Sequence, residues 1–280
     1  MSDTSTIPVS VIIMTKDEER VLPQTLASVA RFDQVFVVDS HSTDGTCAIA
    51  SQADVEVVQF TWQGGYPKKK EWCLLNLPFR NDWLLYLDAD EVVPQALADE
   101  LRRLFDGGKP THAAYDVLLD YYFLGKKLRH GHKVTKRVLV NRNLTTWPHV
   151  DDLNVTTMWE VERHYQPAID GPVGHLHAPL EHNDRDPLFD YFARHNRYSD
   201  WEAHLLRREE IASSVQDLRS ARGRRYARVP FKPAAFFAYS YLARFGFLDG
   251  AAGFHYAVAH AFYFWQISVK QLELSGAPSR

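Results

Sequence analysis

The sequence has few cysteines, little net charge and none of the familiar glycine-rich phosphate loops. Its 280 residues include two cysteines, Cys47 and Cys73, which cannot form a disulfide framework and fit a reducing compartment. Neither a Gly-X-Gly-X-X-Gly motif nor a Walker loop is present, which excludes the dinucleotide and P-loop modes of phosphate binding and disfavours a nucleotidyltransferase. The net charge of -3 argues against general nucleic-acid binding.

Residues 1–8 contain neither the basic region nor the apolar core of a signal peptide, so we expect an intracellular, cytoplasmic protein. A hydrophobic content of 45% is enough to build a sizeable core. The length suits one large α/β domain or one domain with a substantial appendage.

Apolar runs alternate with helical patterns in the first 110 residues. Leu22, Leu26 and Val29 recur at helical spacing between the first two runs. Alternating strands and helices predict a mostly parallel sheet with right-handed crossovers. The predicted buried strands of this half are residues 9–14, 35–38, 55–60 and 83–87.

Three of these strands end in polar clusters, at residues 15–18, 39–44 and 88–91. In a parallel sheet such ends share one edge, where open α/β sheets bind ligands. Asp88 and Asp90 can both face one ion where the chain turns, and hard oxygen ligands suit Mg2+ or Mn2+ bound to phosphate oxygens. The alternative is that these acids only complement the dipole of the helix that Pro94 opens.

The segments 11–18, 37–46 and 87–91 together resemble family 2 inverting glycosyltransferases of the GT-A fold. The resemblance implies a Rossmann-like sheet, a nucleoside-diphosphate-sugar donor that is UDP-linked, and Mn2+ or Mg2+ as the cofactor. It also implies that Asp39 reads the base, that Asp88 lies near the ribose and the metal, and that Asp90 ligates the metal. The donor-binding residues expected from motifs and resemblance are Thr15, Asp17, Glu18, Asp39, Ser40, Lys70, Asp88, Ala89, Arg129 and His130.

Several of these assignments have open alternatives. Lys70 falls where the family often has a lysine, whereas its neighbours Lys68 and Lys69 can equally lie on a solvated face. Residues 122–131 resemble a segment of bacterial enzymes that extend lipopolysaccharide cores and lipid-linked glycans. Within it, Arg129 and His130 are expected either to meet the diphosphate or the acceptor, or only to cap a turn.

His182 precedes Asn183 and Asp184 and matches a family position near the donor phosphates, so we assign it to the metal together with Asp88 and Asp90. The alternative for His182 is a structural role, which we expect for the other histidines of this region. Residues 115–119 and 138–140 are expected to form two further strands.

An inverting transfer needs a base that takes the proton of the acceptor hydroxyl, and a carboxylate is the usual choice. Residues 159–165 follow the middle strands, but they lack the His-Glu pair of many relatives. We favour Glu162, with Glu160 as the close alternative on the same face of an extended segment. Asp151 and Asp152 are further alternatives, and either glutamate can instead be a surface partner of Arg163.

The last third of the sequence combines basic and aromatic segments. Asp186 and Pro187 open a predicted helix that runs to Arg208. The aromatic-rich segments 234–247 and 251–269 predict an amphipathic pair that lies in the headgroup region of an anionic membrane, or alternatively a packed subdomain or homodimer interface. Five cations without an acid precede and adjoin these segments: Arg222, Arg224, Arg225, Arg228 and Lys232.

We therefore expect an α/β GT-A catalytic domain over residues 1–185, with a nucleotide-sugar half (1–110) and an acceptor half (111–185), and a helical region over 186–280. The expected activity is inverting transfer of a sugar to a lipid-linked glycan or lipopolysaccharide-type acceptor by an enzyme peripheral on the inner face of the cell membrane. The alternatives are a polyprenyl-phosphate glycosyltransferase and a catalytically silent nucleotide-sugar-binding or membrane scaffold protein.

Overall fold

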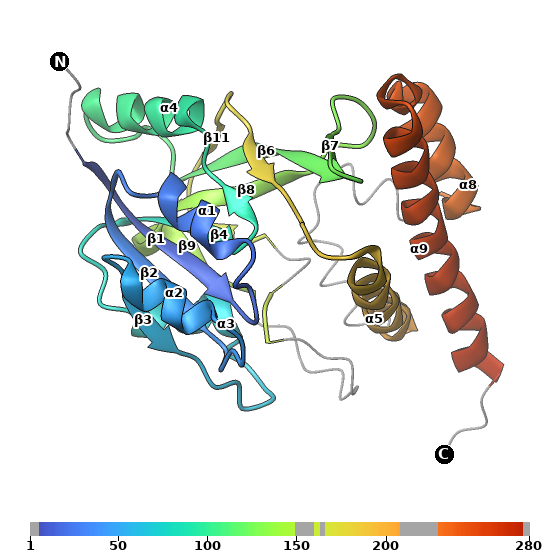
Figure 1. Ribbon diagram of the computed structural model, residues 1–280, viewed down its shortest axis with the longest axis horizontal. Coiled ribbons are helices and arrows are strands. Elements are labelled where there is room, and N and C mark those ends of the chain that lie inside the picture. The colour runs from blue at the N-terminus through green and yellow to red at the C-terminus, as the bar shows by residue number, and fades with distance from the viewer. Residues whose placement is uncertain (1–5, 149–159, 163–165, 208–228, 277–280) are drawn as a thin grey trace.

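The computed structural model describes residues 6–148, 160–162, 166–207 and 229–276, and its centre is one mixed sheet (Figure 1). The strand order is β3-β2-β1-β4-β8-β6-β12-β5, with β7 and β11 also paired to β6. The strands are β1 (Ile7–Thr15), β2 (Phe32–Asp39), β3 (Glu56–Gln59), β4 (Trp83–Asp88), β5 (Glu91–Val92), β6 (Ala114–Phe123), β7 (Lys126–Lys127), β8 (Thr135–Asn141), β11 (Val173–His175) and β12 (Leu180–His182). A separate antiparallel pair consists of β9 (Thr145–Thr146) and β10 (Ala168–Ile169).

The helices cover the sheet and form a group at its far side. They are α1 (Leu22–Ser28), α2 (Thr46–Gln52), α3 (Lys69–Asn76), α4 (Gln95–Asp106), α5 (Leu188–Arg207), α8 (Lys232–Phe237) and α9 (Ala251–Gly276). Short helical turns are η1 (Arg142–Leu144), η2 (Ala238–Ala243), which is a π-helix, and η3 (Gly246–Asp249).

The first four strands are parallel, as the alternation of strands and helices predicts. Central strand β1 is buried on both faces, because Val11 and Ile13 pack towards α1 and α4 while Ile12 and Met14 pack towards α3. This explains why the strand is a continuous apolar run rather than an alternating one. The predicted α/β class and mostly parallel sheet are confirmed.

The second half of the sheet contains antiparallel pairs. β8 runs antiparallel to both β4 and β6, and β12 is parallel to β6. The chain leaves β4 at Asp88, turns through Ala89 and Asp90, and pairs β5 with β12 so that Glu91 lies opposite His182. This long-range pairing brings the end of the nucleotide half next to residues about ninety positions later in the sequence.

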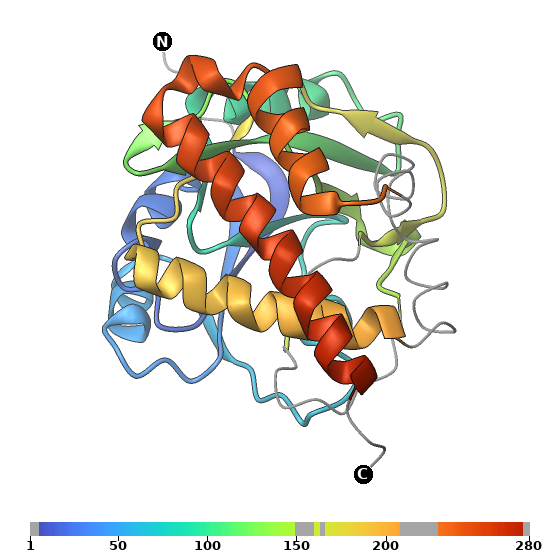
Figure 2. The same cartoon turned by 90° about the vertical axis from the view of Figure 1, so that its right-hand side faces the viewer.

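The C-terminal helices form a group beside β6 and β7, and α9 crosses α5 in the turned view (Figure 2). Their contact with the sheet is an apolar cluster in which Phe123 and Leu128 meet Ala252 and Tyr256. The helix predicted to start after Asp186 is confirmed as α5. Within the described parts of the chain, no helix has both the length and the apolar character needed to cross a bilayer.

Candidate functional site

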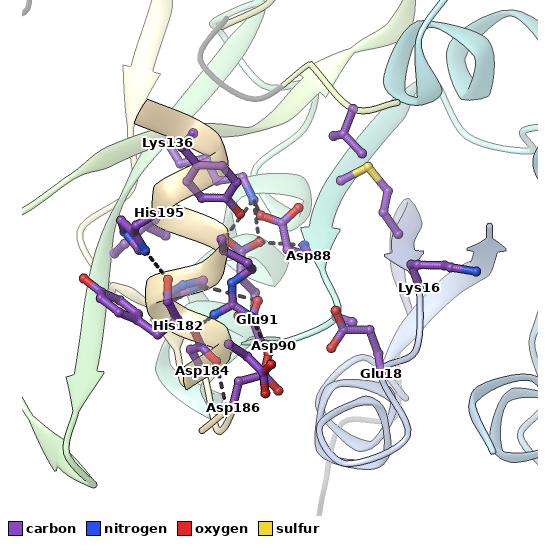
Figure 3. A pocket seen from close by; sticks show the side chains of 18 of the residues that line it. Lys16, Glu18, Asp88, Asp90, Glu91, Lys136, His182, Asp184, Asp186 and His195 are labelled. Carbon is purple, nitrogen blue, oxygen red and sulfur yellow. Dashed lines mark hydrogen bonds and ion pairs between the residues drawn. The ribbon is translucent and has the colours of Figure 1, made fainter. Parts of the chain in front are cut away.

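A cavity of about 1120 Å³ opens at the carboxyl ends of β1 and β4 and extends to α5 (Figure 3). Residues of α9 also line it. Nine of the residues predicted from the sequence line it: Thr15, Asp17, Glu18, Lys70, Asp88, Ala89, Asp90, Glu160 and His182. The remaining ones, which are not among its lining residues, are Asp39, Ser40, Arg129, His130 and Glu162. Asp151 and Asp152 lie outside the described residues.

Asp39 holds together the loops that follow β1 and β2. Its fully buried carboxylate accepts hydrogen bonds from Thr15 Oγ1 at 2.9 Å, from the Ser42 amide at 2.8 Å and from Cys47 Sγ at 3.2 Å. Burial favours the neutral acid, but these donors outweigh it and lower the pKa of Asp39 to about 2. In this structure its oxygens are used within the loops, so the predicted reading of the base by Asp39 stays a prediction.

The lysines at the start of α3 are all buried, so none lies on a solvated face. Lys69 Nζ donates to the Thr15 carbonyl at 3.0 Å and to Ser40 Oγ at 2.6 Å, which joins the ends of β1 and β2 to α3. Ser40 Oγ in turn donates to Glu160, whose carboxylate also lies 3.5 Å from Lys69. Ser40 and Lys69 thus hold the Glu160 carboxylate in place, and Glu160 still lines the cavity.

Glu162 caps helix α3. The N-cap position is Lys68, whose ammonium cannot accept a hydrogen bond from the first amides of the helix. The nearly fully buried Glu162 carboxylate instead accepts the amide hydrogens of Lys70 at 2.8 Å and Glu71 at 3.0 Å. A carboxylate at a helix N-terminus also interacts favourably with the helix dipole, so this contact has a structural role of its own.

Lys136 on β8 neutralises two of the acids that follow β4. Its ammonium lies 2.9 Å from Asp88 Oδ2 and 2.6 Å from Glu91 Oε2 (Figure 3). Glu91 Oε2 also accepts the Asp88 amide at 2.8 Å. Burial alone would favour the neutral carboxyl of Asp88, but Lys136 and Lys70 outweigh it and lower the pKa of Asp88 below its ordinary value.

Asp90 and His182 face each other across the β5–β12 pairing. His182 Nδ1 lies 3.4 Å from Asp90 Oδ1, and the Asn183 amide donates to the Asp90 carbonyl at 3.0 Å. The Nδ1 atom is buried and has no hydrogen-bond partner among the described residues. The His182 ring is supported by an edge contact with Tyr121 at 5.0 Å. The two groups thus converge on one point of the cavity wall.

The part of the cavity around Asp90 carries an excess of negative charge. Burial, Asp90 and Asp186 raise the pKa of Glu18 to about 8, and burial with Asp88 and Asp184 also raises the pKa of Asp90. Arg194 of α5 forms ion pairs with both Asp184 and Asp186, and its charge also opposes the rise in the pKa of Glu18 without cancelling it.

This excess fits a divalent cation. Carboxylate oxygen and imidazole nitrogen are ligands that Mn2+ accepts, and Asp90 with His182 supplies one of each. No group of three or more His, Cys, Asp or Glu side chains in the described residues is arranged to hold a metal by itself. A bound ion would therefore depend on ligand oxygens in addition to these two protein groups, as Mg2+ does when it bridges phosphates.

The segment that contains Arg129 and His130 contacts the C-terminal helical turns through its backbone amides. The His130 amide donates to Asp249 Oδ2 at 2.8 Å, and the next amide, that of Gly131, donates to the Arg244 carbonyl at 2.9 Å. The segment therefore anchors η2 and η3, while Arg129 itself is exposed. Their predicted contact with the donor or the acceptor stays a prediction.

The sequence interpretation missed two groups of cavity residues. Lys136 and Arg194 are the cations that balance the acids, but nothing in their local sequence indicates which acids they meet. The second group is an aromatic wall on α5 and α9. Its only sequence signal is a repeated Tyr-X-X-X-His-X-X-Tyr spacing, at 191–198 and again at 256–263.

Comparison with known proteins gives a family match. The family model described as glycosyl transferase family 2 matches residues 10–155, just over half of the chain. An uncharacterized glycosyltransferase of Rickettsia bellii is 36% identical over 121 residues, which are 42% of this chain and 40% of that protein. The lipopolysaccharide core biosynthesis glycosyltransferase LpsC of Rhizobium meliloti is 31% identical over 103 residues, 35% of this chain and 37% of that protein.

These matches leave much of each relative uncovered, because the chain spans about 40% of the length of the curated relatives. Among solved structures, S. aureus TarS (residues 1–349) is similar with a TM-score of 0.43 and 14% identity, over 97% of this chain and 93% of that chain.

The hydrogen bonds to Asp39 give a testable stability effect. Because its pKa is lowered from 3.8 to about 2, the ionised side chain stabilises the fold above pH 4, and this contribution is lost as the pH falls through 2. We expect Asp39→Asn to lower the free energy of unfolding by about 2 kcal/mol at pH 6, and the gap to shrink between pH 4 and 2. Urea unfolding across this pH range measures it. Exposed Asp54→Asn is the matched control, and a gap that does not change with pH would contradict the assignment.

Proposed function

The chain belongs to glycosyl transferase family 2, and we propose that it is a metal-dependent, inverting glycosyltransferase. In this proposal the donor is a UDP-linked sugar, and the acceptor is a lipid-linked glycan or lipopolysaccharide-type molecule. The observation that carries the proposal is the convergence of Asp90 and His182, 3.4 Å apart, in a cavity at the carboxyl ends of β1 and β4.

The proposed donor pocket is the part of the cavity formed by the loop after β1 and by α3. Lys70 lines it, with its ammonium 5.1 Å from the Trp147 ring centroid and 3.4 Å from the Glu162 carbonyl. Burial lowers the pKa of Lys70, although Asp88 opposes this shift. In our proposal this lysine faces the donor diphosphate, and Thr15 with Asp17 frames the nucleoside.

The divalent ion, Mn2+ or Mg2+, is proposed to be held by Asp90 and His182 together with the donor's phosphate oxygens. When bound, it would neutralise the charge that develops on the leaving diphosphate. Asp88 is proposed to lie beside the ion and the ribose, with its carboxylate fixed by Lys136. The raised pKa values of Asp90 and Glu18 result first from burial and then from neighbouring carboxylates, and a bound cation would relieve both effects.

In the proposed reaction the acceptor hydroxyl oxygen attacks the anomeric carbon on the face opposite to the diphosphate. The bond from that carbon to the phosphate oxygen breaks, its electron pair leaves with UDP, and the hydroxyl proton passes to a carboxylate. We propose Glu160 as that base, since its carboxylate is in the cavity wall. Glu162, which sequence reasoning favoured, remains the alternative despite its cap on α3.

The proposed contact with an anionic membrane uses the outer face of the C-terminal helices. α9 exposes a stripe of apolar side chains at helical spacing, consisting of Phe254, Val258, Phe262, Trp265, Val269 and Leu272. Phe231, Phe245 and Phe247 are exposed on the neighbouring segments. The sequence from 222 to 232, which ends at the first residue of α8, carries five cations that suit an anionic surface. We propose peripheral binding at the cytoplasmic face; a homodimer over the same stripe is the alternative outcome.

Asp90→Asn tests the metal site. Because the carboxylate is proposed to hold the ion that stabilises the leaving diphosphate, we expect metal-dependent UDP release to fall about 100-fold or more, with the fold retained. UDP release at limiting Mn2+, together with circular dichroism, measures both effects, and exposed Asp54→Asn is the control. An Asp90→Asn protein as active as wild type would refute the metal assignment. Wild type that releases no UDP would favour a silent binding or scaffold protein.

Paired Gln substitutions identify the base. Glu160→Gln is expected to lower the transfer rate about 100- to 10,000-fold. It also removes the charge opposite the buried Lys69 ammonium, so we expect a lower free energy of unfolding as well. Glu162→Gln weakens the α3 cap, so we expect it to lower stability by about 1 kcal/mol and to keep a near-normal rate. Transfer kinetics of both variants separate the two roles, and urea unfolding measures both losses of stability. The reverse kinetic result would move the role to Glu162, and two active variants would discard both residues.

Liposome co-sedimentation tests the membrane proposal. Neutralising Arg224, Arg225 and Arg228 together should weaken binding to anionic vesicles by roughly 100-fold before screening, at about 1 kcal/mol per cation. Binding should also fall as salt rises. Phe262→Ser with Trp265→Ser should weaken it, whereas Leu75→Ser, at an exposed position of α3, should not. If the unmodified protein stays in the supernatant at low salt, the membrane proposal is wrong. The apolar stripe of α9 would then be favoured as a dimer interface, which sedimentation velocity detects.

A further inference from the structure

Helices α5 and α9 carry the same aromatic pattern towards the cavity. α5 contributes Tyr191, His195 and Tyr198, and α9 contributes Tyr256, His260 and Tyr263. Positions i, i+4 and i+7 lie on one face of a helix, so each set forms a single row. The rows meet, because the His195 ring is 5.7 Å from Tyr263 and 5.9 Å from His260. We call these six side chains the aromatic wall.

A single side chain, that of Tyr121, connects the aromatic wall to the Asp90–His182 pair. Tyr121 of β6 contacts His182 at 5.0 Å and Tyr256 at 6.2 Å between ring centroids. Figure 3 shows His195 on α5 in the same view as His182 and Lys136. A molecule that lies on the wall would thus be next to the proposed ion and to the sugar to be transferred.

Both histidines of the wall are oriented by the backbone of their own helix. His195 Nδ1 lies 2.8 Å from the Tyr191 carbonyl, and His260 Nδ1 lies 3.2 Å from the Tyr256 carbonyl. A carbonyl oxygen can only accept, so each Nδ1 carries a proton, and in the neutral ring Nε2 keeps its lone pair. Burial, followed by His195 and His132, lowers the pKa of His260 to about 3, so this ring stays neutral.

The wall also contains an unsatisfied hydroxyl. The Tyr191 hydroxyl oxygen is buried and has no hydrogen-bond partner among the residues that the structure describes. A buried polar group without a partner costs free energy, which a ligand hydroxyl in the cavity can recover. Tyr191 is itself packed against Phe123 at 5.5 Å, so its ring is fixed before a ligand arrives.

The composition of the wall selects the ligand class. All six side chains are uncharged when His195 is neutral. Two arginines of α5 also line the cavity: Arg194 is engaged by Asp184 and Asp186, and Arg197 lies outside the six-residue wall. Rigid aromatic faces suit apolar C–H surfaces, while tyrosine hydroxyls and Nε2 acceptors suit hydroxyl groups. A sugar ring presents both kinds of surface, whereas a phosphate would need cations at this position.

We propose that the aromatic wall is the acceptor subsite and that it binds a neutral, hydroxyl-rich sugar ring, the unit that carries the attacking hydroxyl. This assignment deepens the proposed function and rests on it. The inner face of α9 then recognises the acceptor, while the outer face of the same helix carries the exposed apolar stripe.

The test uses methyl glycosides of glucose, galactose and mannose as neutral probes, and the corresponding hexose 6-phosphates as charged ones, in saturation-transfer NMR with the full chain. At least one neutral probe should bind, and Tyr191→Phe, which removes only the hydroxyl, should weaken it roughly fivefold to tenfold. His260→Phe should do the same. Tyr239→Phe, at an exposed position not among the cavity's lining residues, is the control.

The subsite would be overturned if no neutral probe binds, or if a 6-phosphate binds at least as well as its neutral counterpart. An unchanged affinity in both folded variants would also overturn it. Asp90→Asn separates this proposal from the preceding one. If Asp90→Asn keeps glycoside binding but the wild-type protein releases no UDP, the proposed transferase activity is wrong and the sugar subsite is retained. If the wild-type protein releases UDP but binds no glycoside, only the subsite is wrong.

Discussion

The carboxylate of Glu91 is fully buried, and the arrangement of the cavity depends on how its charge is balanced. Burying one charge is costly unless an opposite charge and hydrogen bonds accompany it. Lys136 of β8 supplies the charge and the Asp88 amide supplies a hydrogen bond, which ties β4, β5 and β8 together at one point. The same lysine holds Asp88, while Asp90 turns the other way to face His182. The buried Glu91 thereby helps to place Asp88 at Lys136 and Asp90 at His182.

The features that the sequence predicts well are those encoded over short distances. A run such as Val9–Met14 has no alternation, so it predicts a strand buried on both faces, and β1 is such a strand. The acids at 88–91 follow a strand directly, and in a parallel sheet that position alone puts them at the ligand edge. His182 required the family pattern in addition, because only the pairing of β5 with β12 brings it to Asp90.

The features that the sequence could not predict depend on contacts between distant segments. Glu162 reads locally as a free carboxylate of an extended segment, yet it caps a helix ninety residues earlier. From the sequence, Lys69 can equally lie on a solvated face with Lys68, but its ammonium is buried between the ends of β1 and β2. Arg129 and His130 belong to a segment that meets η3, and no periodicity before residue 140 indicates where the C-terminal helices dock. In each case the role of the residue depends on a contact with a segment that is distant in the sequence.

The aromatic residues of α9 illustrate how one composition serves two environments. From sequence, the segment 251–269 is rich in residues typical of membrane interfaces, and this predicts one function for all of them. The helix divides them by its 3.6-residue period: Tyr256, His260 and Tyr263 face the cavity, while Phe254, Phe262 and Trp265 face outwards. The inner set contains the hydroxyl and imidazole groups, and the outer set is almost wholly apolar. Because both sets belong to one rigid helix, a surface that holds the outer face would also fix the distance from that surface to the cavity.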